Sequence, residues 1–165
     1  MGRGPVQGSA AVDWRGRPGC RASARCGLPT SLLEILRVQN GGQVASLWNA
    51  FPTDVATSWS ENNVPLDDVM GIGQSGGQVS LLDSAYLVEE WGLPSPLVLL
   101  SGDDHCWIAL DYRVSGELGE PSVTWFDVDG NTELPLAGDF RTFIERLTAA
   151  ASLDLDTPNG SRSAS

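Results

Sequence analysis

Alternating apolar and polar residues dominate the second half of the chain and predict strands. Residues 97–100 are all apolar, as in a strand covered on both faces, whereas residues 106–113 and 122–128 alternate in polarity. Because short connections join the three segments, we expect them to pair as an antiparallel meander. Trp107 and Trp125 are expected on the more polar side of this sheet, either packed beneath a helix or exposed as binding anchors. Burial statistics for tryptophan favour the packed arrangement.

Helical patterns flank these strands. Ser31 and Glu34 form an S-x-x-E pattern, which predicts a capping box at the start of a short helix. Gly41 and Gly42 can adopt the left-handed conformation that ends it. From residue 43 to residue 77 turn residues occur throughout, and a long irregular segment inside a compact domain is often functional.

Two further helices are expected. The first covers residues 80–91, with Ser80 or Asp83 as its N-cap, and Gly92 followed by Pro94 ends it. The last helix is amphipathic, with apolar residues three and four positions apart at Phe140, Phe143, Ile144 and Leu147.

Together these patterns predict an α+β fold: a central, mostly antiparallel sheet, with a meander near the C-terminal half, flanked by about three helices. A length of 165 residues suits one domain. We expect a disordered leader rich in arginine and glycine over residues 1–27, a single domain over 28–152 and a disordered tail over 153–165.

The net charge of the chain limits the classes of molecule that it is expected to bind. The chain carries a net charge of -11, although residues 1–26 alone hold five arginines against Asp13, a local balance of +4. An acidic field repels nucleic acid and anionic lipid and attracts basic proteins. No apolar run is long enough to span a bilayer and no signal peptide is evident, so we expect a cytoplasmic protein. The three cysteines form no C-x-x-C pair, which argues against a zinc knuckle or a disulfide framework.

The stretch "SGDDHCWIALDYR", residues 101–113, gathers the residue types of a catalytic or metal site. Adjacent side chains on an extended chain alternate in direction, so Asp103, Asp104 and His105 would not converge on one metal ion, and for the same reason the neighbouring His105 and Cys106 would not form a catalytic dyad. We therefore expect no catalytic residue, no metal and no cofactor, and interpret the stretch as a turn entering a strand. Asp111 and Arg113, two apart on one face, are placed to pair.

Five segments together resemble the SUKH superfamily, the family of the fungal cell-wall assembly regulator and its bacterial relatives. They are "LPTSLLEILRVQNGG", "DDVMGIG", "YLVEEWGLPSPLVLLSGDDHCWIALDYR", "EPSVTWFDVD" and "LAGDFRTFIERL", which span about Leu28 to Leu147. The resemblance implies an α+β fold without an established catalytic site, and bacterial members are mostly regarded as immunity proteins that neutralise toxins. Relatives usually read Gly-Asp-Gly-His at the turn, whereas this chain has Asp104 at the second glycine. If that position needs a positive φ, Asp104 adopts it at some strain.

Charge and resemblance together predict a non-enzymatic immunity protein that occludes a basic toxin, with a nuclease as the expected class. The alternative is a regulatory or scaffolding module that binds an endogenous protein. The sequence sets no oligomeric state. The candidate contact residues are carboxylates, aromatic anchors and the single histidine: Trp59, Asp67, Asp68, Glu89, Glu90, Asp103, Asp104, His105 and Trp107.

Overall fold

The computed structural model of the chain describes residues 27–73 and 79–156. The leader expected over residues 1–27 therefore lies, apart from Gly27, outside the described residues, as does the tail beyond Asp156. None of the helices in the described ranges is long and apolar enough to cross a membrane.

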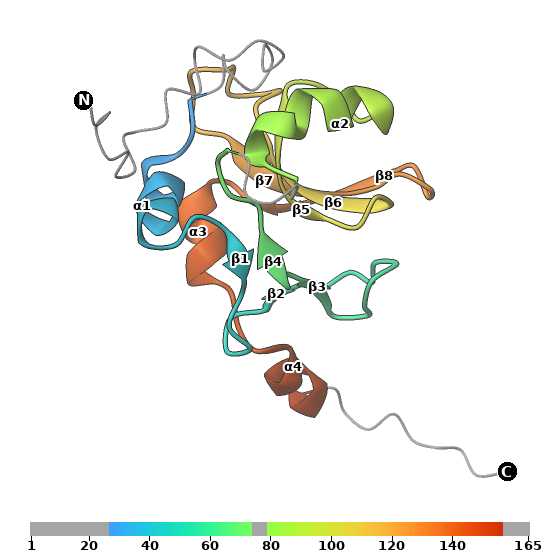
Figure 1. Cartoon of the computed structure of the whole chain (residues 1–165). Coiled ribbons are helices and arrows are strands. Elements are labelled where there is room, and N and C mark those ends of the chain that lie inside the picture. Colours follow the sequence, from blue (N-terminus) through green and yellow to red (C-terminus); the bar gives the residue numbers. More distant parts are fainter. Residues whose placement is uncertain (1–26, 74–78, 157–165) are drawn as a thin grey trace, which may run out of the picture.

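A four-stranded antiparallel sheet forms the centre of the molecule (Figure 1). Its strands follow one another in chain order: β5 (Leu97–Gly102), β6 (Cys106–Asp111), β7 (Ser122–Asp127) and β8 (Thr132–Ala137). The predicted meander is confirmed and extended by β8, which the sequence analysis did not identify. β8 is an edge strand with little burial and contains Pro135, so it lacks the apolar alternation that marks its neighbours.

The register of β6 against β7 decides which side chains share a face. Ile108 lies opposite Trp125 and Trp107 lies opposite Phe126. Directly opposite residues of an antiparallel pair point to the same side. The alternation predicted along β6 and β7 is therefore confirmed, but the two tryptophans lie on opposite faces of the sheet. The expectation that both occupy one polar side was wrong, and both faces are covered.

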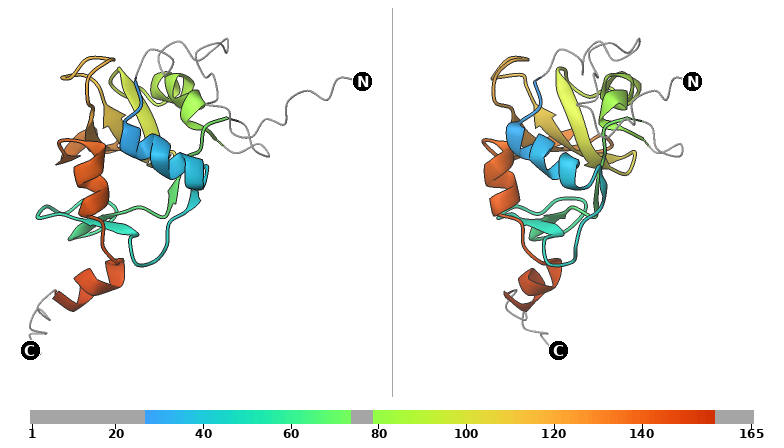
Figure 2. Two further views of the ribbon diagram at one scale, coloured as in Figure 1. Left: turned by 90° about the vertical axis from the view of Figure 1, so that its left-hand side faces the viewer. Right: turned by 60° about the vertical axis from the view of Figure 1, so that its left-hand side comes forward.

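Helices cover the two faces of the sheet and define two cores (Figure 2). On one face, α1 (Thr30–Val38) and α3 (Phe140–Glu145) pack on a core that contains Ile108 and Trp125. On the other face, α2 (Ser84–Glu90) packs on a smaller core that contains Trp107. The predicted α+β architecture is confirmed, because apolar residues on both sides of each central strand require a layer of helix on each side.

The helix termini follow local chemistry with one exception. The 3-10 turn η2 (Leu81–Asp83) precedes α2, and the side chains of Ser80 and Asp83 form the reciprocal capping box. The capping box expected between Ser31 and Glu34 is absent. Helix α1 begins at Thr30 after Pro29, so Ser31 already lies inside its first turn, and the N-cap residue makes no side-chain hydrogen bond.

The segment expected to be irregular contains four short strands. β1 (Gly42–Gln43) pairs with β4 (Asp68–Val69), and β2 (Ala50–Pro52) pairs with β3 (Asn63–Pro65). Each is two or three residues long, too short to show an alternation in the sequence.

The C-terminal part differs from the single closing helix that was expected. Ala50 forms a β-bridge with Thr148, which interrupts the helical segment after α3. A further helix, α4 (Ala150–Asp156), follows and contacts β2 and β3. Helix α4 therefore crosses the domain boundary that was placed at residue 153, and the rest of the expected tail lies outside the described residues.

Candidate partner-binding face at the β5–β6 turn

The stretch that gathers Asp, His and Cys forms a tight turn between β5 and β6. One carboxylate oxygen of Asp103, Oδ1, accepts hydrogen bonds from the backbone amides of His105 and Cys106, at 3.2 and 2.9 Å. Asp104 has a φ of 74°, in the left-handed region that Asp and Asn tolerate better than most residues. Gly102 packs directly against the indole ring of Trp107, where a Cβ atom would overlap the ring. The expected turn is thus confirmed, including the positive φ at Asp104.

Trp59 joins the β2–β3 loop to this turn. Its Nε1 donates a hydrogen bond to the second oxygen of Asp103, Oδ2, at 3.2 Å. Its ring meets Trp125 edge-on, with the ring centroids 6.1 Å apart. Because Trp59 is only partly buried, its ring links the core beneath the sheet to the surface of the turn.

Two hollows open beside the turn. The first, with a volume of about 350 Å³, is lined by Trp59 together with Asp67, Asp68 and Asp103. The second, about 520 Å³, shares Asp68 and Gly102 with the first and adds Asp104. Asp68 is held at their junction, where its Oδ1 accepts a hydrogen bond from Ser101 Oγ at 3.1 Å.

We call this surface the acidic turn face and define it by Trp59, Asp67, Asp68, Asp103 and Asp104. All four carboxylates are exposed, and two separate loops and one strand bring them together.

Positive charge is scarce throughout the described residues. They contain every acidic side chain of the chain except Asp13, but only four arginines, at positions 37, 113, 141 and 146. No arginine within residues 27–73 and 79–156 forms an ion pair with the acidic turn face. Four carboxylates with no such partner create a negative potential over the two hollows.

His105 lies on the edge of this surface but turns toward a different carboxylate. Its Nδ1 is 2.9 Å from Asp129 Oδ2, and both side chains are more than half exposed. Its ring lies beside Trp91, with a centroid distance of 6.2 Å. In the part of the chain that the structure describes, no three His, Cys, Asp or Glu side chains are grouped so that they could hold a metal ion.

Cys106 lacks the surroundings of an activated nucleophile. Burial is the main cause that raises the pKa of its thiol; a hydrogen bond with Ser58 opposes it, and the charges of Asp127, Asp103 and Asp129 raise the pKa further. The thiol is therefore held in its protonated, less reactive form near neutral pH.

Five of the nine predicted contact residues meet at the acidic turn face, and His105 lies beside it. Glu89 and Glu90 are exposed on α2 and line neither hollow. Trp107 is only 2% exposed, because it packs beneath α2 against Leu87 and Val88. It contributes to the wall of the second hollow, but its low exposure means that it supports the turn from within and presents almost no surface to a partner.

The sequence analysis missed Asp127, the last residue of β7, and Asp129, which lies in the turn between β7 and β8. Asp127 Oδ1 accepts a hydrogen bond from the Gly130 amide at 2.8 Å, which lowers the pKa of this carboxyl group below its usual value. The signal was present in "DVDGN", a sequence with strong turn chemistry directly after a strand. Because β8 was not predicted, the position of this turn beside His105 could not be inferred from the sequence.

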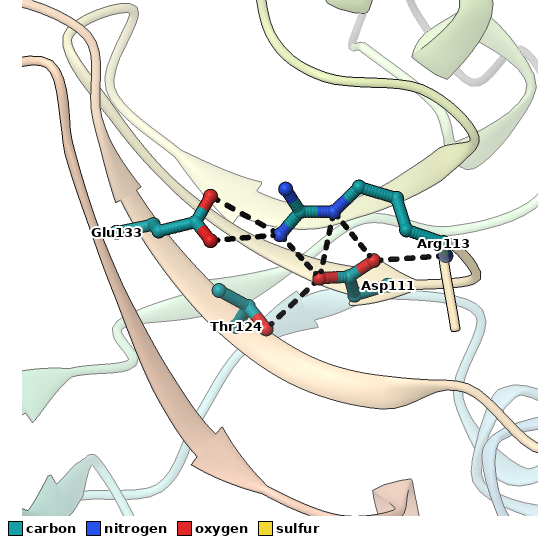
Figure 3. A network of polar contacts seen from close by, with 4 residues as sticks. All are labelled: Asp111, Arg113, Thr124 and Glu133. Atoms are coloured by element: carbon teal, nitrogen blue, oxygen red, sulfur yellow. Dashed lines mark hydrogen bonds and ion pairs between the residues drawn. The ribbon is translucent and has the colours of Figure 1, made fainter. Parts of the chain in front are cut away.

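A second polar cluster lies on the α2 side of the sheet and ties three strands together (Figure 3). Arg113 Nη2 lies 2.7 Å from Asp111 Oδ2 and 3.1 Å from an oxygen of Glu133, and Thr124 Oγ1 also reaches Asp111. Hydrogen bonds from Arg113, set against the cost of burial, hold the pKa of Asp111 below its usual value. The expected local pair is confirmed. Because its charges are mutually satisfied, we interpret this cluster as structural.

The fold and the site define an acidic α+β domain in which exposed carboxylates surround one aromatic side chain. A sequence profile of the SMI1 / KNR4 family (SUKH-1) matches residues 21–146, and the chain belongs to this family, which confirms the resemblance found in the sequence. No curated protein and no solved structure matches the chain. SUKH proteins act through protein–protein interaction, so membership supports a protein-binding role, immune or regulatory.

Proposed function

We propose that this protein is a non-enzymatic immunity protein that neutralises a basic toxin by docking on it through the acidic turn face. The observation that carries the proposal is the grouping of Asp67, Asp68, Asp103 and Asp104 beside Trp59, without an arginine partner among the described residues. Family membership supports a protein as the ligand.

The chemistry suits a nuclease as the partner. A nuclease binds phosphates in a groove lined by arginine and lysine, and a rigid array of carboxylates presents charge of the same sign as the phosphates. Trp59 adds a flat aromatic surface on which an arginine side chain can stack. A bound domain would then cover the groove and exclude the substrate without any catalytic step.

A non-enzymatic role agrees with the chemistry of the turn. His105 faces Asp129, and the burial-raised pKa of Cys106 keeps its thiol protonated. The second candidate function is regulation or scaffolding through an endogenous basic protein. The gene context separates the two functions, since a toxin gene directly upstream favours immunity and an isolated housekeeping context favours scaffolding.

Where the gene directly upstream encodes a toxin domain, co-expression of that domain with this chain in the bacterial cytoplasm tests the proposal. The wild-type chain should restore growth and co-purify with the toxin. The variant Asp67→Asn/Asp104→Asn removes two charges from the face at side chains that make no hydrogen bond needed for the turn. Loss of two close charge pairs, each worth at least about 1.5 kcal/mol, should weaken binding by roughly 100-fold or more.

The matched control is Glu120→Gln/Asp154→Asn, which removes the same net charge at exposed positions away from the hollows. Affinity for the toxin should also fall steeply between 50 and 500 mM salt, because exposed charges are screened within about 10 Å at 0.1 M. Rescue without co-purification, or equal weakening in both variants, would contradict docking through this face.

A further inference from the structure

The C-terminal part of the described chain lies outside the two cores. The family profile ends at residue 146, and Leu147, 6% exposed, is the last residue of the described chain that packs in a core. Within residues 148–155, all of which the structure describes, no side chain belongs to either core. We propose that residues 148–156 form a detachable strap, which opens while the central sheet stays folded and which, when closed, holds the loop that carries Trp59.

Hydrogen bonds to neighbouring loops and to β2 hold the strap in place. The amide of Ala50 donates to the Thr148 carbonyl at 3.0 Å, and the amide of Thr148 donates to the Ala50 carbonyl at 2.9 Å. The first amide of α4 donates to Asn49 Oδ1 at 3.0 Å, and Asn62 Nδ2 donates to the Leu153 carbonyl at 3.1 Å. Because these groups bond to water when the strap is open, the net stabilisation from each bond is modest.

Helix α4 adds little stability of its own. It lies at the end of the molecule away from the four-stranded sheet (Figures 1 and 2) and has seven residues, whereas a helix alone in water needs about 12–15 to be marginally stable. Between residues 151 and 155 only Leu153 is partly buried, and Leu155 is 86% exposed. Elements with few buried apolar contacts open at a free energy far below that of global unfolding.

The part of the fold that the strap leaves behind stays anchored. Phe143 of α3 is 1% exposed, and its ring stacks on that of Phe51 in β2 with the centroids 5.2 Å apart. The guanidinium carbon of Arg146 lies over the same Phe51 ring, 4.9 Å from its centroid. Ala50 also keeps its pairing with Pro65 of β3. The opening therefore begins after α3 and frees the outer backbone edge of β2 at Ala50.

Polar side chains connect the strap to the loop between β2 and β3. Asn62, which binds α4 through its Nδ2, accepts a hydrogen bond through its Oδ1 from Asn63 Nδ2 at 2.7 Å. Asn63 is 4% exposed, and the same Nδ2 lies 3.0 Å from the Oγ of Ser60, the residue that follows Trp59. When the strap opens, Asn62 loses its contact with α4, and the position of Trp59 is less restricted. The strap is thus a two-state element that biases the orientation of Trp59.

Two full-length variants at one exposed position of α4 test the proposal. Asp154→Pro removes a backbone donor and places a ring against the carbonyl four residues earlier, so it breaks the helix. Asp154→Ala is the matched control, because it removes the same charge and favours the helix. Native-state hydrogen exchange, followed by NMR, compares the amides of Ala50 and Thr148 with those of β6, which is paired on both sides. The indole N–H resonance of Trp59, assigned with Trp59→Phe, reports on the loop.

In the wild type the amides of Ala50 and Thr148 should exchange roughly 100-fold faster than those of β6, or more. Asp154→Pro should speed their exchange by roughly a further 10- to 100-fold, up to the rate of an unprotected amide, while the amides of β6 stay protected. Asp154→Ala should not speed it. The Trp59 resonance should move in Asp154→Pro and keep its position in Asp154→Ala.

If the amides of Ala50 and Thr148 are as well protected as those of β6 in the wild type, the proposal is overturned, because residues 148–156 then unfold only with the whole domain. Loss of the folded spectrum in Asp154→Pro would overturn it for the same reason. An unchanged Trp59 resonance in Asp154→Pro would overturn the link to the loop. All these measurements use the free chain, so they are independent of the toxin experiment, and only a consequence for partner binding rests on the proposed function.

Discussion

Replacing Arg113 by alanine should lower the free energy of unfolding by about 2–4 kcal/mol. The side chain of Asp111 is only 8% exposed, so the variant leaves a nearly buried carboxylate without its charged partner. Removing one partner of a fully buried pair costs about 3–5 kcal/mol, and the 30% exposure of Arg113 places this pair toward the lower end. Losing the contact with the Phe126 ring, 5.5 Å from the guanidinium carbon, adds about 0.5 kcal/mol.

Urea unfolding followed by tryptophan fluorescence measures this loss. Glu133→Gln is the control, because its ion pair with Arg113 is about half exposed and should contribute only about 0.2–1 kcal/mol. In the double variant Asp111→Asn/Arg113→Ala the uncompensated charge is gone, so part of the stability should return. A cost below about 0.5 kcal/mol for Arg113→Ala, or one no larger than that of Glu133→Gln, would refute the reasoning.

The pH dependence of this pair has a definite sign. The pKa of Asp111 is lower in the folded protein than its usual value of 3.8. Its stabilising contribution is therefore complete above the unfolded-state pKa and is lost as the pH falls through the folded-state pKa. The gap in stability between wild type and Arg113→Ala should be largest near pH 7–8 and should narrow as the pH falls, because protonation relieves the unpaired Asp111 of the variant and, below about pH 4, removes the pair of the wild type. A gap that widens on acidification would contradict the assignment of a charged pair.

Three shorter predictions test the turn and its support, each by urea unfolding. Gly102→Ala forces a Cβ atom into the ring of Trp107 and should cost about 1–3 kcal/mol, with a changed near-UV circular dichroism spectrum. Trp59→Phe keeps an aromatic ring but loses the hydrogen bond to Asp103, which should cost about 0.5–1.5 kcal/mol. Ser80→Ala removes a helix cap and should cost about 0.5–2 kcal/mol, whereas no loss would mean that the capping box does not stabilise η2 and α2.

Strong periodicity made the central strands and helices predictable from the sequence. The alternation along β6 and β7 and the apolar spacing of α3 survive in the structure because each reflects a face that must be buried. The capping box at Ser31 failed for a local reason, since α1 has Pro29 as its N-cap and so begins two residues earlier than a Ser31 cap would set. Pro135 and the exposure of β8 concealed the fourth strand, because an edge strand has no buried alternation to reveal it.

The candidate site was predictable in its parts but not in its arrangement. "SGDDHCWIALDYR" identified Asp103 and Asp104, and turn chemistry explained why they are exposed. Their neighbours Trp59 and Asp67 come from segments more than 30 residues earlier, connected through strands of two or three residues. The periodicity of apolar residues indicates local structure and not contacts between distant segments. The hollows beside the turn could therefore be found only in the structure.

Within the acidic turn face, structural and binding roles fall on different carboxylates. Asp103 uses Oδ1 for the turn amides and Oδ2 for Trp59, so its replacement would disturb the fold as well as the charge. Asp104 needs a residue that tolerates a φ of 74°, a demand that asparagine meets and alanine does not. Asp67→Asn and Asp104→Asn therefore remove charge while preserving the turn. If a basic ligand binds both variants as tightly as it binds the wild type, the protein does not hold its partner by electrostatic attraction to this face.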